Sequence, residues 1–199
     1  MAPPRLALFT RFPEPDKAKT RLIPGVGALA AAAIHRTLTE RTVATLVAGA
    51  AKCPVEIHYT GADEPAFRAW LGEGLVYVRQ PQGDLTARLL AALEPSPVIF
   101  FGADTPDLSP DHVRAAIDAL TTHDVVLGPA EDGGYYLIGV AASHAFLFAD
   151  MAWSTPAVLT ETLKRLAARD IAPAMLPVLA DCDRPEDLAR WPWLVGSCV

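Results

Sequence analysis

Short apolar runs alternate with helical segments along most of this chain. Residues 6–9, 55–59 and 98–101 are strand-like, and the Ala-rich segment 28–48 between the first two has helical character. An unbroken apolar run of four residues fits a strand that is buried on both faces of a sheet. Later segments predict a helix from Thr155, a short strand over 175–179 and a last helix after residue 181. Strands that alternate with helices predict an α/β fold with a mainly parallel sheet and right-handed crossovers.

Size and composition predict a single globular domain over 1–199. The chain has 199 residues, of which 51% are apolar and 20% are charged, and its net charge is −6. This charge argues against a broad nucleic-acid surface. No apolar run approaches the ~20 residues of a membrane span, and the amino-terminal residues lack the apolar stretch of a signal peptide. We therefore expect a cytoplasmic protein, with Cys53, Cys182 and Cys198 as free thiols.

The strand-like run at residues 98–101 leads into a polar turn. Gly102 permits a turn or the close approach of a ligand, and Asp104 and Asp107 follow it. In open parallel sheets, ligands bind at the carboxyl ends of central strands, and a hard divalent cation there prefers oxygen ligands. The same residues also fit an acidic turn before a helix capped at Ser109. A metal site and a capped turn are therefore both open interpretations.

A basic loop follows the first predicted strand. It carries Arg11, Lys17, Lys19 and Arg21 in a chain that is acidic elsewhere. Such side chains suit phosphate oxygens, and the loop after the first strand of a doubly wound sheet meets the ligand crevice. A solvated loop that binds nothing is the alternative. Neither GxxxxGK[ST] nor GxGxxG is present, which excludes a P-loop NTPase and the dinucleotide fingerprint.

Two later segments carry further carboxylates. Glu131 and Asp132 precede Gly133 and Gly134 in a turn between predicted strands, where they suit a hydroxyl-rich substrate, a metal or the tip of an ordinary hairpin. Asp183 is either a second metal ligand or a helix N-cap. GxSxG and HExxH are absent, so we assign no nucleophile and no metal-binding histidine.

Six blocks of sequence together resemble the DUF2064 family, also described as arsenosugar-biosynthesis-type glycosyltransferases. The blocks, which span nearly the whole chain, are residues 9–22, 82–85, 102–108, 128–139, 153–155 and 181–188. The block Gly-Pro-Ala-Glu-Asp-Gly-Gly-Tyr-Tyr-Leu-Ile-Gly is long and specific. The family is similar in turn to GT-A-type nucleotide-sugar transferases and to nucleotidyltransferases such as 2-phospholactate guanylyltransferase.

The resemblance implies a three-layer α/β/α, Rossmann-like GT-A fold that uses Mg²⁺ or Mn²⁺. It implies that Asp104 binds the metal together with Asp183, or with Asp181 in its place. The residues implied to bind the nucleotide and its phosphates are Thr10, Arg11, Lys17, Lys19, Arg21, Asp84 and Gly102. The residues implied to face the acceptor are Glu131, Gly133, Gly134, Tyr135 and Trp153.

The leading hypothesis is a metal-dependent transferase with a nucleotide-activated donor and a small-molecule acceptor, in the first place a glycosyltransferase acting on a nucleotide sugar. The metal would stabilise charge on the leaving phosphate through Asp104, and Asp132 is the candidate base. A nucleotidyltransferase that joins an NTP to a phosphorylated small molecule is the alternative, since its basic loop grips a triphosphate. Asp16 and Thr86 stand where the family has Gly, and they favour a third possibility, a nucleotide-binding module without turnover.

Overall fold

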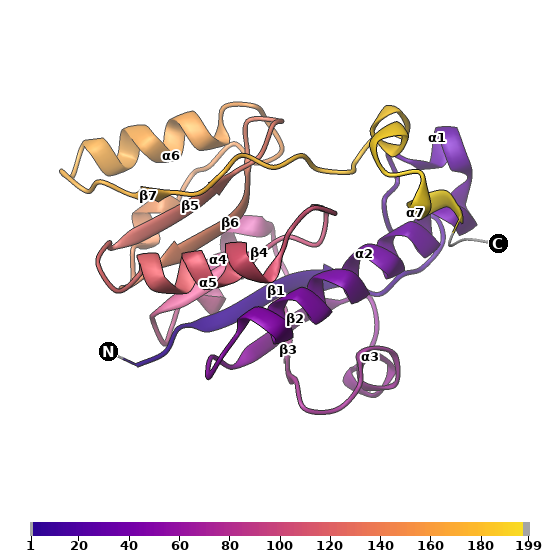
Figure 1. Cartoon of the computed structure of the whole chain (residues 1–199), viewed down its shortest axis with the longest axis horizontal. Helices are drawn as coiled ribbons and strands as arrows, with labels where there is room; N and C mark the ends of the chain where they lie inside the picture. The colour runs from indigo at the N-terminus through magenta and orange to yellow at the C-terminus, as the bar shows by residue number, and fades with distance from the viewer. Residues whose placement is uncertain (1, 197–199) are drawn as a thin grey trace.

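A seven-stranded sheet forms the centre of the structure, a computed structural model that describes residues 2–196 (Figure 1). The strands are β1 (Arg5–Arg11), β2 (Val55–Thr60), β3 (Val76–Arg79), β4 (Val98–Phe101), β5 (Val125–Pro129), β6 (Tyr135–Val140) and β7 (Ala174–Met175). Their order is β3-β2-β1-β4-β6-β5-β7. Strand β6 runs antiparallel to both of its neighbours, and all other pairs are parallel. The predicted α/β class with a mainly parallel mixed sheet is therefore confirmed.

Helices cover both faces of this sheet, which confirms the three-layer arrangement. The α-helices are α1 (Ile23–Val26), α2 (Ala28–Gly49), α3 (Glu64–Leu71), α4 (Leu85–Ala92), α5 (Pro110–Ala119), α6 (Val158–Ala167) and α7 (Trp193–Gly196). Two 3₁₀ helices are η1 (Ala145–Leu147) and η2 (Pro185–Arg190). Helices α2, α3 and α5 pack on one face, and α4, η1 and α6 pack on the other. Figure 1 shows α2 and α5 side by side over the sheet.

Strand β4 is buried because its side chains pack alternately into the hydrophobic cores on the two faces of the sheet. Ile99 and Phe101 pack in the core beneath α2 and α5, whereas Val98 and Phe100 pack in the core beneath α4 and α6. All four are buried, as an unbroken apolar run predicts. Because β4 pairs in parallel with β1, the loops that follow these two strands leave the sheet at the same edge.

The carboxyl-terminal part of the chain returns to this edge. Leu188 and Trp191 pack with Leu22, Ile34 and Leu38 in a third buried cluster at the amino-terminal end of α2. Figure 1 shows η2 and α7 beside α1 at this end of the molecule. The segment that leads there is tied to the end of β4, because the amide of Cys182 donates to the carbonyl of Asp104 at 2.8 Å.

Several boundaries differ from the sequence prediction. Helix α6 begins at Val158 and not at Thr155, whose hydroxyl donates to the carbonyl of Ala152 in a preceding turn. The strand expected over 175–179 is reduced to β7 and a single bridge at Leu179, since Pro177 has no N–H to donate to a neighbouring strand. The helix expected after residue 181 is divided into η2 and α7.

Other sequence expectations concern the thiols and the membrane. Cys53 and Cys182 are free thiols, as expected, and Cys198 lies outside the described residues. Within residues 2–196, every helix is too short or too polar to cross a membrane.

Candidate active site

Three segments that are far apart in the sequence meet at the side chain of Lys19. Its Nζ atom lies 2.7 Å from Asp104 Oδ1 and 3.5 Å from Asp183 Oδ1, and it donates to the carbonyl of Cys182 at 2.6 Å. Arg21 contacts the other oxygen of Asp183 at 2.6 Å. The basic loop after β1, the end of β4 and the segment after β7 are therefore joined by charge-assisted contacts.

Mutual attraction keeps this cluster charged. Burial disfavours the charged form of Lys19, whose side chain is only 4% exposed, but the carboxylate of Asp104 outweighs it and raises the Lys19 pKa above its ordinary value. Desolvation likewise opposes ionisation of Asp104, and the ammonium of Lys19 outweighs it and holds the Asp104 pKa below its ordinary value. Near neutral pH the pair is an ammonium and a carboxylate.

Asp181 differs from the other carboxylates of the site. Burial raises its pKa to about 6, and the neighbouring carboxylates of Asp104 and Asp132 act in the same direction. A hydrogen bond from the Thr105 hydroxyl, at 2.7 Å, partly offsets this effect. Asp181 therefore protonates more easily than Asp104 near neutral pH.

His35 fixes the end of β1 from helix α2. Its Nε2 atom lies 2.9 Å from the carbonyl oxygen of Arg11 and 3.4 Å from Thr10 Oγ1, which in turn lies 3.2 Å from Thr39 Oγ1. Burial lowers the pKa of His35 below its ordinary value, so we assign a neutral ring whose Nε2–H donates to the carbonyl of Arg11. No local pattern in the sequence indicates this contact, because it depends on which face α2 turns to the sheet.

Two adjoining cavities surround the Lys19 cluster. The first, the central cavity of about 420 Å³, is lined only by polar and charged residues: Arg11, Lys19, Thr20, Arg21, His35, Asp104, Asp132, Ser154, Asp181 and Asp183. The second, the acidic cavity of about 360 Å³, shares Arg21, Asp132, Ser154, Asp181 and Asp183 with it. Five carboxylates and three guanidinium groups line the acidic cavity. Some residues that line these cavities had no predicted site role, namely Thr20, His35, Pro156, Arg184, Asp187 and Arg190.

The β5–β6 turn contributes one wall of the acidic cavity. Gly133 has φ +89°, and Asp132 Oδ1 accepts from the amide of Gly134 at 2.8 Å. Glu131 is held by Arg190 through two contacts of 2.6 and 3.1 Å. Glu131 and Asp132 line the acidic cavity, whereas the two glycines are not among its lining residues.

Gly102 lines two further cavities. The Arg88 cavity, of about 270 Å³, is lined by Phe9, Thr10, Arg11, His35, Thr60, Gln80, Leu85, Arg88, Gly102, Ala103 and Asp104. The apolar cavity, of about 200 Å³, shares Phe9, Leu85 and Gly102 with it and contains Tyr135 and Trp153. Tyr135 and Trp153 were expected to face the acceptor, but they line this apolar cavity and not the acidic one.

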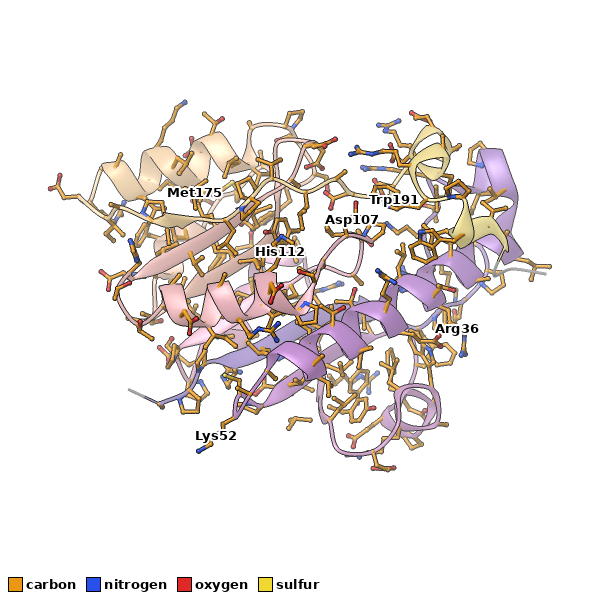
Figure 2. All side chains as sticks on the ribbon, viewed as in Figure 1. Arg36, Lys52, Asp107, His112, Met175 and Trp191 are labelled. Carbon is orange, nitrogen blue, oxygen red and sulfur yellow. The ribbon has the colours of Figure 1, made fainter. Side chains whose placement is uncertain are left out.

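Three predicted or considered side chains, those of Lys17, Asp84 and Asp107, line none of the four cavities. Lys17 is 60% exposed and pairs with Glu14, and Asp84 caps α4 by accepting from the amide of Ala87 at 2.9 Å. The Nε1 of Trp191 donates to Asp107, with 3.1 Å to each carboxylate oxygen, and Figure 2 shows these two side chains close together. Asp107 thus ties the loop after β4 to the carboxyl-terminal segment.

The carboxylates of this site do not suit a metal enclosed by protein side chains alone, but they suit one that also binds a phosphate ligand. Within residues 2–196, no three His, Cys, Asp or Glu side chains are grouped closely enough to enclose a metal. Asp104 and Asp183, which are 48% and 35% exposed, nevertheless converge on one cation, the ammonium of Lys19. Mg²⁺ in transferases is typically held by one or two carboxylates together with substrate phosphates. Asp104 and Asp183 would therefore suit a divalent cation whose remaining ligands include phosphate oxygens.

Comparison with known proteins settles the family. The family model described as "Uncharacterized protein conserved in bacteria (DUF2064)" matches residues 42–155, more than half of the chain. The chain belongs to the DUF2064 family. No curated protein matches it in sequence.

Solved structures similar to this DUF2064 member include one from Desulfovibrio desulfuricans G20, provisionally assigned as a nucleotide-diphospho-sugar transferase. That chain is 28% identical, with 96% of this chain and 88% of that chain covered and a TM-score of 0.87. CMP:2-keto-3-deoxy-manno-octonic acid synthetase with CTP is 13% identical, covers 100% of both chains and gives a TM-score of 0.61. Rv0371c of Mycobacterium tuberculosis with manganese is 17% identical, covers 94% and 97%, and gives 0.59. The latter two likenesses establish the fold alone.

Proposed function

We propose that this chain is a metal-dependent transferase with a nucleotide-activated donor, and that it transfers a glycosyl group from a nucleotide sugar. The observation that carries the proposal is the convergence of Asp104 and Asp183 on Lys19 at the carboxyl ends of β1 and β4. The 28% identity to the D. desulfuricans protein supports a nucleotide sugar as the donor.

The central cavity supports binding of the donor's diphosphate. Lys19, Arg11 and Arg21 offer ammonium and guanidinium donors to phosphate oxygens in a cavity without an apolar side chain. Asp104 and Asp183 would hold a divalent cation there, and a similar fold contains manganese. When bound, such a cation supplies stabilisation of the negative charge that develops on the leaving diphosphate.

The acidic cavity supports binding of a hydroxyl-rich acceptor. Its carboxylates are acceptors for hydroxyl groups, and Asp132 and Asp181 line both this cavity and the central one. An acceptor hydroxyl between the two cavities would lie next to the donor, with Asp132 to accept its proton. Bound donor and acceptor would thereby be aligned, which lowers the entropic part of the barrier.

A ligand panel with a matched pair of variants tests the proposal. We expect nucleotide sugars with Mg²⁺ or Mn²⁺ to raise the melting temperature, since a ligand at 100 times its Kd stabilises by roughly 2.7 kcal/mol. Asp104→Asn should abolish the metal-dependent shift and turnover. Asp107→Asn, in the same loop but bonded to Trp191, should retain both.

Two results would contradict parts of this proposal. A shift with nucleoside triphosphates and none with nucleotide sugars would identify nucleotidyl transfer as the reaction. Nucleotide binding without product release from any donor and acceptor pair would identify a binding module.

A further inference from the structure

The Arg88 cavity differs in chemistry from the central cavity. The central cavity is entirely polar, whereas the Arg88 cavity combines the apolar side chains of Phe9 and Leu85 with the polar groups of Thr10, Gln80 and Arg88. A phosphate suits the first lining. A nucleobase, with apolar faces and a polar edge, suits the second. The two cavities share Arg11, His35 and Asp104, so one nucleotide can extend across both.

Gln80 holds Arg88 in a fixed orientation. The Nε2 of Gln80 donates to the carbonyls of His58, at 2.6 Å, and Thr10, at 3.3 Å. Because both of these partners are acceptors, the orientation of the amide is determined and its oxygen faces Arg88. Nη1 of Arg88 donates to that oxygen at 3.2 Å. The ends of β1 and β2 thus position the guanidinium through one buried amide.

The guanidinium of Arg88 is incompletely paired within the described part of the chain. Its Nε is buried without a hydrogen-bond partner, and among residues 2–196 it forms no ion pair with a carboxylate, whereas Arg21 and Arg190 do. Nε of Arg11, in the same cavity, is also buried without a partner. Partly buried donors without acceptors are costly, so a ligand that brings acceptor atoms would be favoured here.

We propose that Arg88 selects the base of the nucleotide and favours one with two neighbouring acceptor atoms. A guanidinium has only donors, arranged in a planar fork. Guanine offers O6 and N7 side by side, and cytosine offers N3 and O2. Adenine places an amino donor beside each ring acceptor on these edges, and uracil places N3–H between its carbonyls. The inference rests on the proposed nucleotide-dependent function.

Binding of four nucleoside diphosphates tests this inference. Calorimetric titration with GDP, CDP, UDP and ADP, each with Mg²⁺, should show GDP or CDP bound at least about tenfold more tightly than ADP. Arg88→Gln should weaken the preferred nucleotide by about tenfold or more and remove the preference. Pyrophosphate binding, which reports on the central cavity, should stay within about twofold because Arg88 lines the Arg88 cavity and not the central one.

Two further variants separate the effect of the planar guanidinium of Arg88 from that of its charge, and from the effect of removing any arginine nearby. Arg88→Lys keeps the charge but not the planar fork, so it should also lose the preference. Arg79→Gln removes an exposed arginine next to Gln80 and should change none of these affinities. Pyrophosphate binding by the Arg88 variants confirms that they are folded.

Three outcomes overturn the inference in distinguishable ways. Base selection by Arg88 is excluded, while the proposed function stands, if ADP binds as tightly as the tighter of GDP and CDP, or if Arg88→Gln leaves the preference unchanged. Equal weakening of pyrophosphate and GDP identifies Arg88 as a phosphate contact. Failure of all four nucleotides to bind to the wild-type chain removes the proposed function together with this inference.

Discussion

At the scale of single residues, Lys19 occupies the place between two carboxylates that a divalent cation would otherwise fill. Its Nζ lies within 3.5 Å of both Asp104 and Asp183. A buried ammonium prevents the repulsion that two adjacent carboxylates would otherwise experience. Lys19 therefore offsets this repulsion. Under the proposed function, a divalent cation bound by Asp104 and Asp183 would take over that role and leave the ammonium available to a phosphate.

Replacement of Lys19 by methionine tests this exchange. Without metal, Lys19→Met should lower the free energy of unfolding by about 1–2 kcal/mol, because Asp104 and Asp183 lose their shared partner but remain partly exposed. Millimolar Mg²⁺ or Mn²⁺ should restore more stability to the variant than it adds to the wild type, measured by urea unfolding. Lys17→Met, in the same loop, is the control and should change neither value. A variant that gains nothing from metal would exclude this carboxylate pair as the metal site.

The sequence predicted that several residues which follow strand ends would lie close together. Arg11, Lys19 and Asp104 were expected at one place because parallel strands release their loops at the same edge. It did not find His35 or Arg88, because these project from helices, and their direction depends on tertiary packing that no local pattern encodes.

Lys17, Asp84 and Asp107 line none of the four cavities, and each has a partner elsewhere. Lys17 pairs with Glu14, and Asp84 caps α4, so each contacts a residue three positions away in the chain. Asp107 was expected to be a turn residue, but its bond to Trp191 spans 84 positions and could not be read from the sequence.

At the scale of elements, the β5–β6 hairpin, whose turn forms one wall of the acidic cavity, is hydrogen-bonded to the start of α6. The amide of Leu159 donates to the carbonyl of Gly133 at 2.9 Å. A Cβ on Gly133 would overlap the backbone of Pro156, and the φ of +89° disfavours any larger residue. The sequence predicted the turn and its glycines but not this contact, which forms because α6 begins after Pro156.

Substitution within this hairpin tests its role. Gly133→Ala should destabilise the fold by about 1–3 kcal/mol and weaken acceptor use more than nucleotide binding, because Asp132 and Ser154 would shift together. Gly134→Ala is the matched control: its Cβ would meet only the exposed carboxylate of Asp132, at 3.1 Å. It should cost less than about 1 kcal/mol. Similar losses from both substitutions, in urea unfolding and in turnover, would contradict the role assigned to Gly133.

At the scale of the whole molecule, the candidate site is complete only when both ends of the chain are in place. Lys19 precedes α2, Asp104 follows β4, and Asp183 lies beyond β7. The segment that carries Asp183 is fixed by the third buried cluster, through Leu188 and Trp191 against α2. Formation of the site is thereby coupled to packing of the carboxyl-terminal segment.

This coupling predicts a single cooperative unfolding transition for residues 1–199. Trp70, Trp153 and Trp191 lie in different parts of the fold, so tryptophan fluorescence and far-UV circular dichroism should give coincident curves in urea. A nucleotide with Mg²⁺ should shift both curves equally, since binding requires all three segments. Asp104→Asn should keep the coincidence and lose the ligand-induced shift. A fluorescence transition that precedes the loss of circular dichroism would instead show that the segment after β7 unfolds first, and the site would then assemble upon binding.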